Sequence, residues 1–85
     1  MQLHRRPDGS VMVQARMPIY ELNEELGSKI PENDEYDSLG GYIFATLGRI
    51  PSPGETIDAP GYALRIHSAT QRQIQVVHMK PLGDV

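Results

Sequence analysis

Four acidic residues crowd one short segment of the chain: Glu32, Asp34, Glu35 and Asp37. Carboxylate oxygens are the ligands that Mg²⁺ and Ca²⁺ prefer, so this segment is the first candidate for a divalent-cation site. The spacing does not match the calcium loop of an EF-hand, because the D-x-D-x-D-G frame is absent. The alternative interpretation is a solvated loop that ends in a helix cap.

His67 and His78 form the second candidate metal site. If the last two strands pair about a turn at Gln71-Arg72, both imidazoles project from one face of the sheet, in diagonal positions. Zinc requires three or four ligands, and His4 joins the pair only if the first hairpin packs beside these strands. The alternative is a structural or surface role for both histidines.

The sequence contains no recognisable catalytic arrangement. There is no cysteine, and no G-x-S-x-G elbow presents a serine nucleophile. Gly40-Gly41 precedes an apolar stretch, but a Walker phosphate loop needs Gly-Lys-Ser/Thr after a strand, and neither is present. A glycosidase-type carboxylate pair needs a cleft, which so small a chain hardly provides. The sequence therefore predicts a protein that is not an enzyme.

The length of 85 residues predicts a single domain over residues 1–85. An apolar content of 39% supports one modest core. The net charge of −3 argues against binding of nucleic acid. No apolar run approaches the ~20 residues of a membrane span, so direct membrane insertion is not expected. Residues 21–37 contain seven acidic residues and only one basic residue, Lys29, so the rest of the chain is slightly basic.

The first half of the chain predicts a hairpin followed by two helices. Residues 2–6 and 10–14 read as strands about the turn Pro7-Asp8-Gly9. Pro18 is a tolerated first helical residue, and Gly27 ends that helix. The helical stripe consists of Ile19, Leu22 and Leu26. A loop over residues 28–35 follows.

The second helix opens at Asp37 or Ser38, either of which can act as its cap. Its apolar face consists of Leu39, Ile43, Leu47 and Ile50. Gly40 and Gly41 are poor helix formers, so the start of this helix is predicted to pack closely against another element. Gly48 ends the helix, and a rigid turn follows over residues 51–54.

The remaining residues predict a β-meander with strands at 55–58, 62–69 and 73–80. Residues whose numbers sum to 143 should face each other across the last hairpin. This register pairs Leu64 with Met79 and Ile66 with Val77 on an apolar face. On the other face it pairs Arg65 with His78 and His67 with Val76, which gives the alternation of a correct register. The predicted order is ββααβββ, an α+β domain with an antiparallel sheet of about five strands covered by two helices.

Residues 8–82 resemble the CorC/HlyC transporter-associated domain. The most specific segments are Tyr36-Asp37-Ser38-Leu39 and Leu47-Gly48-Arg49-Ile50-Pro51-x-x-Gly54-Glu55. Asp8-Gly9-Ser10 and the helical segment 18–27 precede them in the order of the family. Ala15 departs from the pattern, which expects glycine before Arg16.

Several residues of these two segments are expected to have structural roles. Asp37 is expected to cap a helix, and Gly48 to end it. Pro51 and Gly54 shape the turn that follows, and Glu55 is expected to pair with Arg49 across that turn. None of them is an obvious catalyst.

The resemblance implies the C-terminal, cytoplasmic domain of a bacterial inner-membrane protein, from which this chain would be excised. The implied partners are a pair of CBS domains and the transmembrane part of the same protein, which is a magnesium and cobalt efflux protein or a hemolysin. The fold is also similar to a flavin-binding (PCMH-type) subdomain, which implies flavin adenine dinucleotide (FAD) by analogy of fold alone.

The leading hypothesis is a non-catalytic regulatory domain that modulates transport of divalent cations. One alternative is a module that binds a small ligand, either FAD or a divalent ion such as Mg²⁺ or Ca²⁺. Another is a dimerisation module that forms a homodimer. Cations should act on residues 32–37, anions on Arg65, His67 and His78, and dimer contacts should depend on protein concentration.

Overall fold

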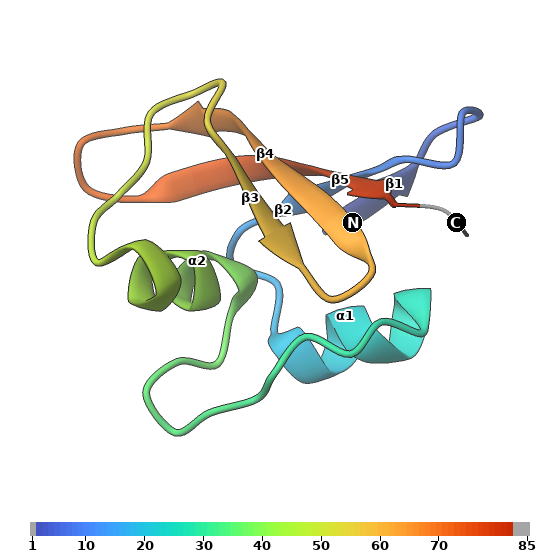
Figure 1. Cartoon of the computed structure of the whole chain (residues 1–85), viewed down its shortest axis with the longest axis horizontal. Coiled ribbons are helices and arrows are strands. Elements are labelled where there is room, and N and C mark those ends of the chain that lie inside the picture. The colour runs from blue at the N-terminus through green and yellow to red at the C-terminus, as the bar shows by residue number, and fades with distance from the viewer. Residues whose placement is uncertain (1, 83–85) are drawn as a thin grey trace.

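The computed structural model of the chain describes residues 2–82, which form one five-stranded sheet and two helices (Figure 1). In chain order the elements are β1 (Leu3–Arg5), β2 (Val11–Gln14), α1 (Ile19–Leu26), α2 (Leu39–Leu47), β3 (Thr56–Ala59), β4 (Tyr62–Ala69) and β5 (Ile74–Pro81). The strands lie in the order β1-β2-β5-β4-β3, and every neighbouring pair is antiparallel. The predicted α+β architecture and the order ββααβββ are confirmed.

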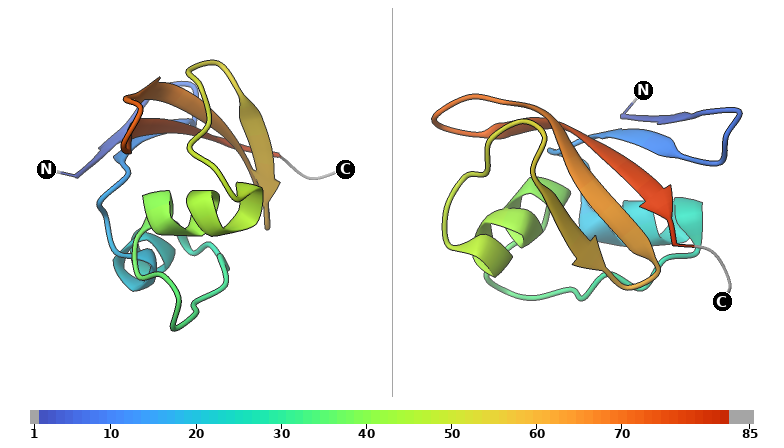
Figure 2. Two further views of the ribbon diagram at one scale, coloured as in Figure 1. Left: turned by 90° about the vertical axis from the view of Figure 1, so that its left-hand side faces the viewer. Right: turned by 45° about the horizontal axis from the view of Figure 1, so that its top comes forward.

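Both helices pack against the same face of the sheet, and the other face is left open (Figure 2). The core lies between the two layers. It is built from side chains of every strand and both helices, and those with no exposed surface are Val13, Leu22, Leu39, Ile43, Leu64, Val77 and Met79. Among residues 2–82, neither helix is long and apolar enough to cross a membrane.

The predicted register of the β4–β5 hairpin is correct up to Ile66, wrong at His67 and Ser68, and correct again where Ala69 faces Ile74. Leu64 faces Met79 and Ile66 faces Val77, while Arg65 faces His78 on the open side. The sequence places His67 opposite Val76, but the structure pairs Val76 with Ser68. One extra residue in β4 shifts the register here, as in a β-bulge, which inserts a residue that has no partner across the ladder.

The helix ends follow the expected glycines, but one predicted cap is wrong. Gly27 and Gly48 adopt left-handed conformations, with φ of 65° and 74°, and end the two helices. At the start of α2, the Ser38 hydroxyl accepts the N–H of Gly41 at 3.2 Å, so Ser38 is the cap and Asp37 is not. The carbonyl of Asp37 instead accepts the N–H of Ile19 at 2.8 Å, which ties the segment before α2 to the start of α1.

Two smaller expectations about the helices also need correction. Pro18 takes the N-cap position of α1 in an extended conformation, with ψ of 141°, so the helix begins one residue later than predicted. Ile50 lies beyond the end of α2 and packs on the core from the following turn.

The close approach expected at Gly40 and Gly41 is present. A Cβ atom on Gly40 would lie 3.1 Å from the Cβ of Ala15, and one on Gly41 would lie 2.8 Å from the Cβ of Tyr36. The N–H of Gly40 donates to the carbonyl of Ala15 at 2.8 Å. The start of α2 is therefore held directly against the segment that leaves β2 at Gly40, and against the preceding loop at Gly41, where a side chain would collide with Tyr36.

Candidate functional site

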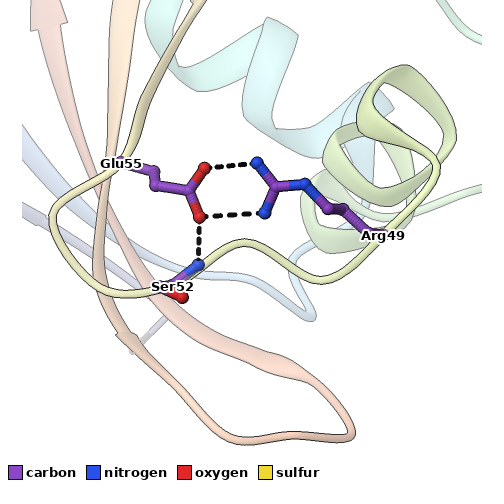
Figure 3. A network of polar contacts seen from close by, with 3 residues as sticks. All are labelled: Arg49, Ser52 and Glu55. Carbon is purple, nitrogen blue, oxygen red and sulfur yellow. Dashed lines mark hydrogen bonds and ion pairs between the residues drawn. The ribbon is translucent and has the colours of Figure 1, made fainter.

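The turn between α2 and β3 is held by an ion pair between Arg49 and Glu55 (Figure 3). The guanidinium of Arg49 donates to both oxygens of the Glu55 carboxylate, and the backbone N–H of Ser52 donates to one of them. These hydrogen bonds, that of Arg49 foremost, lower the pKa of Glu55 to about 2, and the carboxylate in turn raises the pKa of Arg49. The pair expected from the sequence is therefore present.

The neighbours of this pair explain the rest of the motif. Gly54 has a φ of 94°, which side chains other than glycine rarely adopt, and its N–H donates to the carbonyl of Ile66 at 2.8 Å. Pro51 is fully buried beneath the turn. The Glu55 carboxylate already accepts three hydrogen bonds, so it has little capacity left to bind a metal or to act as a base. The motif holds β3 against β4.

The acidic segment lies on the exposed loop between the two helices. Glu32, Asp34 and Asp37 line one shallow hollow of about 270 Å³, together with Ile19, Tyr20, Asn33 and Tyr36. Glu35 is exposed and does not line it. The loop is shaped by Asn33, whose side-chain oxygen accepts the N–H of Glu35 at 2.9 Å, and by the Tyr36 hydroxyl, which donates to the Pro31 carbonyl at 2.8 Å.

Over residues 2–82, no three or more histidine, aspartate or glutamate side chains come close enough together to hold a metal ion. A divalent ion at the acidic loop would therefore take most of its ligands from water or from carbonyl oxygens, as Mg²⁺ commonly does.

The two histidines lie on the open face of the sheet and line one hollow of about 630 Å³. His78 is half-buried and His67 is exposed. His4 does lie in the same row across the strands, but Met12 stands between it and His78. The first hairpin thus packs beside these strands without completing a set of three imidazoles.

Arg6 beside the histidines and one further hollow were not evident from the sequence. Arg6 reaches the histidine hollow from the end of β1, alongside Arg65. A second hollow, of about 410 Å³ at the start of α2, is lined by Arg16, Arg72 and Phe44 among others. Phe44 is 50% exposed, and its place off the apolar stripe of α2 was the one signal in the sequence.

Comparison with known proteins gives matches over nearly the whole chain. The family model described as "Transporter associated domain", CorC_HlyC, matches residues 4–83. The magnesium and cobalt efflux protein CorC of Escherichia coli K12 is 37% identical over 72 residues, which cover 85% of this chain and 24% of that protein. CorC of Salmonella typhimurium is 32% identical over the same shares. The chain therefore spans about a quarter of the length of these relatives.

Solved structures agree with this assignment. A transporter-associated domain from a Xylella fastidiosa hemolysin has a TM-score of 0.86 at 30% identity, covering 98% of both chains. The same kind of domain in complex with Mg²⁺ and Mn²⁺ has a TM-score of 0.87 at 30% identity, covering 98% of this chain and all of that one. With a family model that matches all but a few residues, the chain belongs to the CorC_HlyC family of transporter-associated domains.

Proposed function

We propose that this chain is a non-catalytic accessory domain at the C-terminus of a longer CorC-type protein, where it modulates efflux of Mg²⁺ or Co²⁺ from the cytoplasmic side. The observation that carries the proposal is the family match over residues 4–83, together with curated efflux relatives of which the chain spans about a quarter. The partners in this proposal are the CBS domains and the transmembrane part of the same protein.

The polar contacts of the described residues support a role without chemistry. Within residues 2–82, no serine or threonine hydroxyl is hydrogen-bonded to a histidine, as a nucleophile and its base would be. The hydroxyl of Ser10 donates to Asp8, and that of Ser28 donates to Asn23, both of which shape local turns. Glu55, whose pKa falls to about 2, is engaged by Arg49.

Modulation needs two arrangements of the domain relative to its neighbours, and a ligand that prefers one of them. Such a ligand shifts the equilibrium between the two arrangements by a free energy equal to the difference between its binding free energies for them. The ligand in this proposal is the divalent cation itself, bound at the acidic loop. Glu32, Asp34 and Asp37 share one hollow there, and the related Xylella domain was solved in complex with Mg²⁺ and Mn²⁺.

The binding step can be tested by NMR on the 85-residue chain. Mg²⁺ should shift the amide signals of residues 32–37 saturably, and Mn²⁺, which is paramagnetic, should broaden the same signals. Asp34→Asn should weaken binding. Glu24→Gln, which removes an exposed charge from α1 outside this hollow, is the matched control and should change little. Shifts that are equal in both variants, or absent at millimolar Mg²⁺, contradict cation sensing at this loop.

The regulatory step is tested in the longer protein that carries the domain. Deletion of residues 4–83, and separately Asp34→Asn, should change the rate of Mg²⁺ efflux or its dependence on Mg²⁺ concentration. Expression at the membrane is measured in parallel, so that loss of protein is not mistaken for loss of regulation. Efflux that is unchanged by the deletion refutes a modulating role.

A further inference from the structure

The open face of the sheet gathers two arginines and two histidines from separate parts of the chain. Arg6 follows β1, Arg65 and His67 belong to β4, and His78 belongs to β5. Together they line the hollow of about 630 Å³, and Met12 and Gly54 are among the other lining residues. Arg65 and His78 are direct partners across the strands, and His67 lies at the register shift beside them.

The positive charge in this hollow is largely free. The ion pairs found in residues 2–82 are Arg5 with Glu25 and Arg49 with Glu55, and neither involves Arg6 or Arg65. Both arginines are exposed. Because arginine stays protonated at any physiological pH, these two charges are permanent.

Among residues 2–82, Asp8 is the one acidic residue that lines the hollow, and it is already engaged by hydrogen bonds. Its Oδ1 atom accepts the backbone N–H of Ser10 at 2.9 Å and the Ser10 hydroxyl at 2.6 Å. These bonds, helped by the charges of Arg6 and His78, hold the pKa of Asp8 below its ordinary value. One carboxylate against two arginines leaves the hollow positive before either histidine is counted.

We propose that this hollow binds a phosphate group, held by Arg6 and Arg65 with His67 and His78 as additional hydrogen-bond donors. A guanidinium offers two parallel N–H donors that match the oxygens of a phosphate, and an imidazole adds an N–H donor. The hollow is larger than one phosphate and falls in the size range of small-molecule sites. The group can therefore belong to a free phosphorylated compound or to a phospholipid headgroup.

The proposal is independent of the cation proposal. The acidic loop joins the two helices, which pack on the face of the sheet opposite to the one that carries this hollow (Figure 2). The two sites have opposite charge and share no lining residue. Either one can fail its test while the other passes.

The first test is an NMR titration of the 85-residue chain with inorganic phosphate and with pyrophosphate, at ionic strength held constant with NaCl. The amide signals of Gly54, His67 and His78 should shift saturably. Arg65→Gln should weaken binding about tenfold, as expected for loss of a charge-assisted hydrogen bond. Arg72→Gln removes an exposed arginine from the β4–β5 turn, outside this hollow, and should leave affinity unchanged. Unsaturable shifts, or equal effects of the two variants, overturn the proposal.

The second test identifies the source of the phosphate. The chain is sedimented with vesicles of phosphatidylglycerol and phosphatidylcholine, and with vesicles of phosphatidylcholine alone. Binding to the anionic vesicles that Arg65→Gln abolishes and Arg72→Gln preserves assigns a lipid headgroup. Saturable binding of soluble phosphate without vesicle binding assigns a free compound. Vesicle binding that both variants weaken equally reflects general charge attraction and overturns a defined site on this face.

Discussion

Replacing Gly41 with alanine should destabilise the domain, although alanine is the better helix former. The new Cβ would lie 2.8 Å from the Cβ of Tyr36 and 3.3 Å from the hydroxyl oxygen of Ser38. Tyr36 has little freedom to withdraw, because its hydroxyl donates to the Pro31 carbonyl at 2.8 Å and its ring packs edge-on against Tyr42, with centroids 5.6 Å apart. The contact is therefore expected to act as an overpacked core position does.

Three terms set the size of the effect. Overpacking costs about 1–3 kcal/mol. Disturbing the Ser38 cap, whose acceptor lies beside the new methyl group, adds up to about 1 kcal/mol. In the opposite direction, alanine instead of glycine stabilises the helix by about 1 kcal/mol, because its helix propensity is higher. Together these terms give a net loss of about 0–3 kcal/mol, and about 1.5 kcal/mol at the middle of the ranges. With a urea dependence near 1 kcal/mol per molar, the unfolding midpoint should therefore fall by about 1.5 M.

The assay is urea unfolding followed by far-ultraviolet circular dichroism. Ala45→Gly is the matched control, because Ala45 is exposed in the same helix and the reverse substitution there reports helix propensity alone. That variant should lose about 1 kcal/mol. The reasoning is refuted if Gly41→Ala unfolds at or above the wild-type midpoint while Ala45→Gly unfolds below it, since the space beside Tyr36 would then be open.

Three further predictions concern stability. Ser38→Ala should cost about 1 kcal/mol in urea unfolding, while Asp37→Ala should change little; a larger loss for Asp37→Ala would show that the cap is misassigned. Ile43→Ala removes a side chain with no exposed surface and should cost about 2–5 kcal/mol; a midpoint close to that of the wild type would contradict this. The pKa of Glu55 falls from 4.5 to about 2 in the fold, so its ion pair with Arg49 contributes stability above pH 4.5 that is lost as the pH falls toward 2. Glu55→Gln should remove that part of the pH dependence, and an identical acid profile for the two proteins would argue against the pair.

The order of the elements could be predicted because it depends on local patterns. The stripe of Ile19 and Leu22, the stop at Gly27 and the alternation of β4 are each written in a few consecutive residues. The family motif was equally local, since Arg49 and Glu55 are joined within one short turn. Short-range spacing is enough wherever the interacting groups are neighbours in the chain.

The cap of α2 shows where local patterns stop being enough. Asp37 and Ser38 are both good caps by residue type. The choice falls on Ser38 because the carbonyl of Asp37 is bound to Ile19, and because Pro18 and Ser38 form a bridge between two distant segments. The register at His67 is likewise decided by the fold, where the backbone of residues 54–55 bonds to Ile66 on the neighbouring strand.

The sequence by itself determined the family, the α+β architecture and the uneven placement of charge along the chain. The tertiary structure alone decided that Arg6 joins the basic residues of the last hairpin. The pattern of the last two strands predicts that Arg65, His67 and His78 share a face, but Arg6 comes from a distant point of the chain. It reaches the same hollow because β2 and β5 bring the first hairpin beside the last one. Spacing along a sequence does not encode such a meeting, since it depends on which strands become neighbours and on which face each side chain emerges.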